Sequence, residues 1–198
     1  MPIRNSKGTA LLEFALILPI LLVFALAIID FGLLIQARLI VTNVSREGGD
    51  IASRPLGIPT PQSDLITMLQ TSATPLDLKG AGKICITNIV AGTSEASPSP
   101  TISTSNPQFC EGNLAVSSGI TAQATNLGLT PAMYDHLVFN TASNTAADIQ
   151  GVTVVEVFYQ YSPVTPLPAF IPGILNNGAG ILIGSRAVFC TAISPVGG

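Results

Sequence analysis

Hydrophobic and polar positions divide this chain into an apolar N-terminal stretch and a more polar remainder. From Leu11 to Ile35 the only formally charged residues are Glu13 and Asp30, and Phe14–Ile29 forms an apolar run. A helix rises about 1.5 Å per residue, so this stretch is long enough to cross a hydrocarbon core of roughly 30 Å. The pattern therefore predicts a transmembrane helix. Glu13 is a candidate functional residue, because a carboxylate inside a membrane helix is costly.

Helical periodicity continues beyond the apolar run. Hydrophobic residues recur at spacings of three and four and define one apolar face, at Leu33, Leu34, Ala37, Ile40, Val41 and Val44. Pro19 is the one breaker before Gly48 and Gly49, and we expect it to kink or loosen the helix because it leaves the Ala15 carbonyl without its usual donor. The sequence predicts one long helix over residues 9–50, half in the membrane and half packed on a domain. Its stop is expected at Gly48-Gly49, or at the latest before Pro55.

The remainder of the chain alternates short periodic segments with stretches rich in Ser, Thr, Asn, Gly and Pro. The expected elements are a helix at Ser63–Ser72, a loop at 92–113, a helix from Pro131 to about Phe139 with Thr130 as its N-cap, and strands at Lys83–Val90, Gln150–Ser162 and Ile181–Ile193. Alternation along Gln150–Ser162 places Glu156 on the polar side of its strand. The fold class is therefore α+β, with a long N-terminal transmembrane helix packed on a small, mainly antiparallel sheet.

Composition limits the possible partners. The 198 residues leave room for one anchor and one domain, and only 10% of them are charged, with a formal net charge of −3. The sequence has no basic stripe, so nucleic acid is not an expected partner.

The three cysteines, Cys85, Cys110 and Cys190, are an odd number for a protein outside the cytoplasm. Cys85–Cys110 is the preferred disulfide, because it would close the polar loop between the two residues and stabilise the fold by roughly 3–4 kcal/mol in the chain-entropy model. Two alternatives stay open: Cys190, in the expected last strand, pairs with Cys85, or all three thiols are free and buried.

Catalytic patterns are missing from the sequence. His136 is the one histidine and has no clustered acids beside it, so we expect no metal site and no cofactor. The segment Gly80-Ala81-Gly82-Lys83 resembles a phosphate loop, but Asp77 stands where the first glycine is needed and Ile84 where Ser or Thr is needed. No Ser/His/Asp or paired-acid arrangement can be placed, so the protein is not expected to be an enzyme.

Several short motifs follow one another along the N-terminal helix. They are Gly8, Glu13-Phe14-Ala15-Leu16, Leu18-Pro19, Ile29-Asp30-Phe31-Gly32 and Thr42-Asn43-Val44-Ser45-Arg46-Glu47-Gly48. In this order and spacing they resemble the TadE-like family, the minor pseudopilins of tight-adherence (Flp-type) pili. The resemblance runs from Gly8 to Gly49 and implies a pilin-like fold.

The resemblance also implies roles for single residues. A prepilin peptidase would cut between Gly8 and Thr9, which makes Thr9 the new N-terminus. Glu13 and Phe14 would then form an assembly contact, in which the glutamate of one subunit meets the terminal amine of its neighbour. These two groups carry opposite charges at neutral pH. Alternatively, Gly8 merely precedes a helix, and Glu13 snorkels to the membrane surface. Asp30 is either an interfacial acid or a partner contact.

The expected organisation has three parts: a basic leader peptide at 1–8, a transmembrane and amphipathic helix at 9–50, and an extracytoplasmic α+β domain at 51–198. The expected function is that of a non-enzymatic minor pseudopilin in the bacterial inner membrane. Its partners would be the membrane, the prepilin peptidase, and other pilin and pseudopilin subunits. One alternative is a single-pass envelope protein whose outer domain binds a ligand or partner. Another is an ordinary signal peptide cut after Ala25-Leu26-Ala27, which leaves a secreted protein beginning at Ile28.

Overall fold

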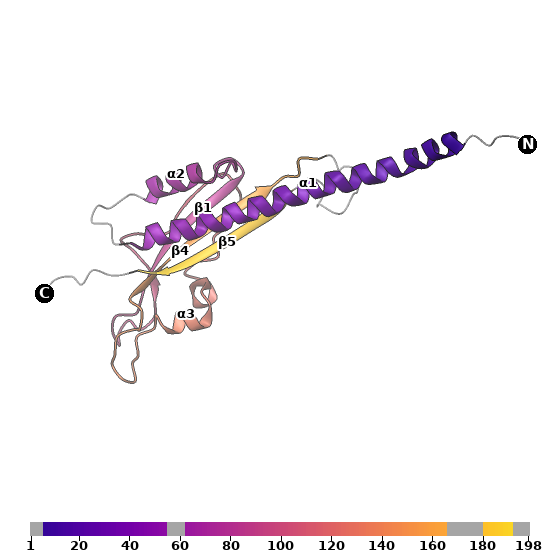
Figure 1. Cartoon of the computed structure of the whole chain (residues 1–198). Helices are drawn as coiled ribbons and strands as arrows, with labels where there is room; N and C mark the ends of the chain where they lie inside the picture. The colour runs from indigo at the N-terminus through magenta and orange to yellow at the C-terminus, as the bar shows by residue number, and fades with distance from the viewer. Residues whose placement is uncertain (1–5, 55–61, 166–179, 192–198) are drawn as a thin grey trace, which may run out of the picture. The chain divides into compact units, whose positions relative to one another are not determined.

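The computed structural model describes residues 6–54, 62–165 and 180–191. Figure 1 shows a long N-terminal helix and a small sheet with two shorter helices. In chain order the elements are α1 (Ser6–Ser53), α2 (Gln62–Ser72), β1 (Gly82–Val90), β2 (Thr101–Ile102), β3 (Phe109–Glu111), the 3-10 helix η1 (Thr125–Gly128), α3 (Pro131–Asp135), β4 (Gly151–Tyr161) and β5 (Ile181–Cys190). The expected α+β class, with a long helix packed on a small antiparallel sheet, is confirmed.

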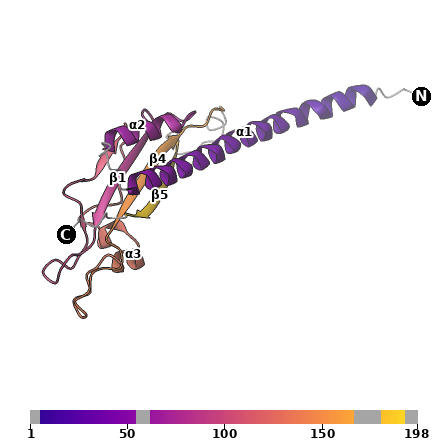
Figure 2. The same cartoon turned by 60° about the vertical axis from the view of Figure 1, so that its left-hand side comes forward.

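The described residues form two compact units. One contains α1 up to Ala37 and the described chain from Tyr161 to Thr165, and the other contains the rest of α1 with α2, α3 and most of the sheet. Helix α1 continues without interruption from one unit into the other (Figure 2).

Of the two predicted ends of the first helix, the stop at Gly48-Gly49 is wrong and the end just before Pro55 is confirmed, because α1 continues to Ser53. The two glycines serve close packing instead. A Cβ atom on Gly48 would lie 2.7 Å from Leu69 Cδ1, and one on Gly49 would lie 2.3 Å from Phe189 Cδ2. The helix also runs unbroken through Pro19; the local kink expected there stays a prediction.

The sheet has the strand order β2-β1-β4-β5, and β3 pairs with β1 as well. Strands β1 and β4 pair antiparallel over the whole length of β1, from Gly82 opposite Tyr159 to Val90 opposite Gly151. The segment 92–113 is not only loop, as we expected, since β2 and β3 both lie within it and pair with β1. These strands are only two and three residues long and lie in a proline- and serine-rich segment, so they give no alternation to recognise, and pairing with the edge of β1 decides their conformation.

Strand β4 is covered on both faces, which corrects the expected alternation of buried and exposed residues. Val155 lies on the face of the sheet that packs against α1, close to Gly48. The opposite face belongs to a hydrophobic cluster whose buried members are Ile89, Ala91, Ile120, Leu127, Leu129, Leu137, Val152 and Val154. A strand buried on both faces reads as a continuous apolar run and leaves no solvent side for Glu156.

The other predicted elements are confirmed in type and differ in their ends. Helix α2 buries Leu65, Ile66 and Leu69 as expected. Helix α3 stops at Asp135, short of Phe139, and Thr130 makes no side-chain capping hydrogen bond. Strand β5 ends at Cys190. Residues 166–179, between β4 and β5 in the sequence, lie outside the described residues.

Cys85 and Cys110 form a disulfide, which confirms the preferred pairing. They face each other on the neighbouring strands β1 and β3, with their Cα atoms 4.1 Å apart. Cys190 is exposed and free. The two alternatives, Cys85–Cys190 pairing and three free thiols, are therefore wrong.

Mass mapping of the exported protein under non-reducing conditions should find the Cys85–Cys110 peptide pair. Replacing both residues by serine should lower the free energy of unfolding by roughly 3 kcal/mol, because the unfolded chain regains the entropy of the open loop. Cys190→Ser is the matched control and should leave unfolding unchanged. Equal destabilisation by Cys190→Ser would contradict this assignment.

Candidate functional site

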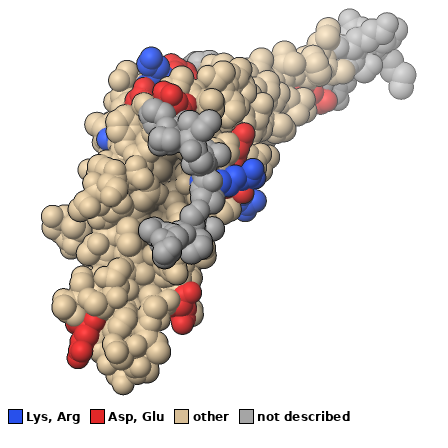
Figure 3. All heavy atoms as spheres, turned by 90° about the vertical axis from the view of Figure 1, so that its left-hand side faces the viewer, with Lys and Arg blue, Asp and Glu red and all other residues tan. Residues whose placement is uncertain are grey.

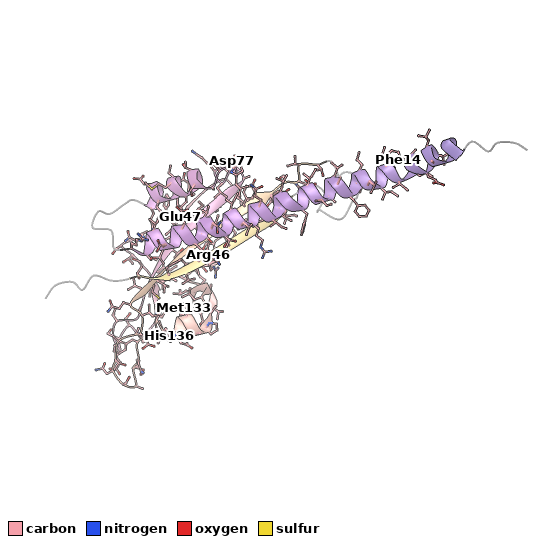
Figure 4. All side chains as sticks on the ribbon, in the orientation of Figure 1. Phe14, Arg46, Glu47, Asp77, Met133 and His136 are labelled. Carbon is pink, nitrogen blue, oxygen red and sulfur yellow. A yellow bond between two sulfur atoms is a disulfide. The ribbon has the colours of Figure 1, made fainter. Side chains whose placement is uncertain are left out.

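The first turns of α1 present an apolar surface that the described protein does not cover. Leu11, Leu12, Phe14 and Leu16 are each more than half exposed, and Figure 4 shows Phe14 projecting from this part of the helix. Within Ala10–Ser53 lies a stretch of mean hydropathy 2.8, none of it buried in the described structure. By length and composition this helix can cross a membrane, where lipid would cover these side chains.

Gly8 lies in the first turns of α1 and is not required by the fold. A Cβ atom built on Gly8 would meet no atom within 4 Å, and its backbone has no left-handed φ. Gly48 and Gly49, by contrast, are needed for close packing. A role for Gly8 must therefore come from something that acts on the chain, such as a protease.

Glu13 is exposed and lies between Leu12 and Phe14 on the apolar part of α1. Among the described residues no hydrogen bond or ion pair reaches its carboxylate. A carboxylate in this position is costly unless it reaches water or a positive partner. The described fold supplies no such partner, so the geometry leaves Glu13 available to a group on another molecule.

Asp30 has partners within its own chain. The backbone N–H groups of Val164 and Thr165 donate to its Oδ1, at 3.0 and 3.1 Å, and the Thr165 hydroxyl donates to its Oδ2. The Tyr161 hydroxyl donates to the Asp30 backbone carbonyl at 3.1 Å. We call this set of contacts the Asp30 clasp. The carboxylate therefore holds residues 161–165 of its own chain, a contact that the sequence did not predict. The two sequence interpretations of Asp30, an interfacial acid and a partner contact, stay predictions.

The comparisons with known proteins bear on this helix. Residues 8–50 match the family model described as TadE-like protein. Comparison with curated proteins and with solved structures gave no match.

The TadE-like segment coincides with almost all of α1 and includes Gly8, Glu13 and Asp30. It shows that this helix is similar to the TadE-like family and, with the length and apolar composition of the helix, suggests association with a membrane. The match ends before α2, so it carries no information on the sheet and its loops.

Beyond the TadE-like segment, the main polar feature is an ion pair between the buried Glu156 and the partly exposed Arg186. Glu156 of β4 is only 2% exposed, and its Oε1 accepts hydrogen bonds from Arg186 Nε at 3.0 Å and Nη2 at 2.6 Å. Gly119 N–H donates to the same oxygen at 3.2 Å, and the Ser118 hydroxyl donates to Oε2. Arg186 also donates to the Gly128 carbonyl at 2.8 Å. The network ties the loop over the sheet to β4 and β5.

Sequence reasoning missed this pair. Glu156 lies in a strand whose alternation suggested a solvent side, and Arg186 lies thirty residues later in another strand. The one available signal was the scarcity of charge, since no charged residue occurs between Glu156 and Arg186. A cavity of about 290 Å³ adjoins the pair and is lined also by Phe158 and Gly184.

The remaining titratable groups form surface contacts. His136, at the end of α3 (Figure 4), lies 2.9 Å from Asp148, and both side chains are more than half exposed. Asp77 accepts a hydrogen bond from the Gly80 N–H at 2.8 Å, so its carboxylate closes the turn that resembled a phosphate loop.

Burial, and secondly the Asp77 carboxylate, raise the pKa of the Tyr159 hydroxyl above its ordinary value of 10.0. Tyr159 therefore stays neutral at physiological pH.

Charged side chains are sparse on the surface. On the face shown in Figure 3, Lys and Arg form small separate groups with acidic side chains close to most of them. No group of three or more potential metal ligands occurs among the described residues. Neither finding points to a reaction, which leaves the helix as the candidate functional site.

Proposed function

We propose that this protein is a non-enzymatic minor pseudopilin that takes part in assembly of a tight-adherence pilus. The observation that carries the proposal is the TadE-like match over residues 8–50, on a helix whose apolar surface and one acid near its start are left uncovered. A prepilin peptidase would remove residues 1–8, and Thr9 would become the N-terminus.

Gly8 supports the processing step. Its surroundings are open and its backbone conformation suits any residue, so the fold gives no reason for a glycine there. A peptidase that accepts only a small residue before the bond it cuts does give one. The basic residues Arg4 and Lys7 would leave with the leader.

Glu13 supports the assembly step. After processing it would be the fifth residue, on the same apolar helix as a new terminal amine. We propose that Glu13 of one subunit pairs with the amine of the neighbouring subunit, with Phe14 packing at the same contact. Since an unpaired carboxylate is penalised in a lipid-like setting, this pairing would select one register between adjacent helices.

The domain beyond residue 50 would lie outside the cytoplasm of a bacterium, anchored in the inner membrane by α1. The Cys85–Cys110 disulfide supports this location, because disulfides persist in oxidising compartments and are rare in the cytosol. Other pilin and pseudopilin subunits are the proposed partners of the assembled form.

The mature N-terminus tests the proposal directly. N-terminal sequencing of the protein purified from membranes should begin at Thr9. A start at Met1 would favour an uncut single-pass envelope protein whose domain binds a ligand or partner, for which the cavity beside Arg186 is the place to look. A start at Ile28 would indicate an ordinary signal peptide and a secreted product.

A further inference from the structure

We propose that the turn held by the Asp30 clasp, residues 161–165, is a second membrane contact of this protein. In this proposal the turn lies in the interface of the bilayer that α1 crosses, and the Val164 side chain contacts the acyl chains. The partner is therefore a lipid surface. The inference goes beyond pilus assembly and depends only on α1 spanning a membrane.

The depth of the turn follows from the depth of Asp30. Asp30 lies about 28 Å along the helix axis from Leu11, where the apolar stretch begins. The hydrocarbon core is roughly 30 Å thick, so Asp30 is near its far edge. The amide nitrogens of Val164 and Thr165 lie 3.0 and 3.1 Å from Asp30 Oδ1, which fixes the turn at the same depth.

The Asp30 clasp supplies hydrogen-bond partners to polar groups that would otherwise oppose burial in lipid. Backbone N–H groups at membrane depth need acceptors, and a carboxylate there needs donors. Here the two amides and the Thr165 hydroxyl meet both needs at once. Tyr161, which is buried in the protein, donates its hydroxyl to the Asp30 backbone carbonyl and so adds a further contact that holds the turn on α1.

Two apolar side chains beside the clasp are uncovered. Val164 is 75% exposed, and Phe31, which follows Asp30, is 63% exposed. A single exposed apolar residue is ordinary on the surface of a soluble protein. Val164 and Phe31, however, lie next to the stretch of α1 that is proposed to cross the membrane. The sequence after Thr165 continues as Pro-Leu-Pro-Ala-Phe-Ile-Pro-Gly-Ile-Leu, without a charge. An uncharged, apolar chain suits lipid better than a polar protein partner.

Tryptophan fluorescence gives a direct test, because the chain contains no tryptophan. The full chain carrying Val164→Trp is reconstituted in vesicles of phosphatidylethanolamine and phosphatidylglycerol with brominated acyl chains. Its emission should be blue-shifted and should lose most of its intensity to bromine quenching. Phe24→Trp, within the span, is the quenched control, and Ser105→Trp, on an exposed loop of the domain, is the unquenched one. Water-like, unquenched emission from Val164→Trp would overturn the proposal.

The role of the clasp is tested in the same background. Asp30→Ala should lower the quenching of the Val164→Trp reporter towards that of Ser105→Trp, because the two amides lose their acceptor. Asp30→Asn keeps one carbonyl oxygen for these amides and should retain most of the quenching. Mapping of the Cys85–Cys110 disulfide verifies that each variant is folded. Unchanged quenching in Asp30→Ala would show that the clasp does not position the turn.

Discussion

Glu13→Ala is expected to leave removal of residues 1–8 intact and to reduce the number of surface pili at least about tenfold. The acid lies five residues beyond the proposed cleavage site, so the peptidase should still cut. The neighbouring subunit's amine, however, loses its partner in a water-poor setting, where close charge pairs are worth on the order of 2 kcal/mol. Each 1.4 kcal/mol corresponds to about a tenfold change in an equilibrium constant. Glu13→Gln should resemble alanine more than wild type, because charge rather than shape makes the contact.

The matched variant Gly8→Val should fail at the earlier step. A branched side chain should not fit a site that accepts glycine, so the protein would stay in the membrane with its leader. Since a Cβ at this position meets no atom within 4 Å, the fold itself should tolerate the change. N-terminal sequencing of the membrane fraction and counts of surface pili separate the two defects.

Glu95→Ala removes an exposed acid from a loop of the domain and is the control for charge loss alone. It should leave both processing and piliation unchanged. Normal piliation in Glu13→Ala would reduce Glu13 to an acid that snorkels to the interface. Normal cleavage in Gly8→Val would remove the main argument for a pseudopilin.

Arg186→Met is expected to lower the free energy of unfolding by on the order of 1–2 kcal/mol. The substitution keeps much of the side-chain volume and removes the guanidinium from Glu156, whose side chain is only 3% exposed. The buried carboxylate then loses its positive partner, but solvent around the 37% exposed Arg186 side chain already screens the pair and makes the loss smaller than for a fully buried pair. Urea unfolding of the full chain in detergent, followed by circular dichroism, measures the change.

Two further variants make this test specific. Arg46→Met removes an arginine from the exposed face of α1 and should change unfolding little. The double variant Glu156→Met with Arg186→Met should be less destabilised than the sum of the single changes, because no charge is then left buried. Additive effects would mean that the two residues do not act as a pair.

Local patterns were sufficient for several elements. The apolar run and the following spacing of three and four predicted α1, and the inward positions of α2 were correct. The Cys85–Cys110 disulfide was also predicted, although for a different reason. We expected it to close a polar loop, whereas the structure shows a bridge between paired strands. The proposed roles of Gly8, Thr9, Glu13 and Phe14 stay predictions.

The errors came from features that depend on distant parts of the chain. Gly48 and Gly49 looked like a helix stop, but they allow α1 to approach Leu69 and Phe189 closely. Strands β2 and β3 looked like loop, since they are only two and three residues long in a proline- and serine-rich segment and are ordered by pairing with the edge of β1.

The sequence by itself determined that a long apolar helix with a TadE-like pattern precedes a small α+β domain. Helix formation depends on residues three or four positions apart, and the ability to cross a membrane depends on one continuous apolar run. Both properties can therefore be predicted from short stretches of sequence. Only the tertiary structure decided the partners of the Asp30 and Glu156 carboxylates. Asp30 meets a turn more than a hundred residues away, and Glu156 meets Arg186 on another strand. Burial makes such contacts necessary, because a carboxylate out of water must be paired, but it does not say with which residue.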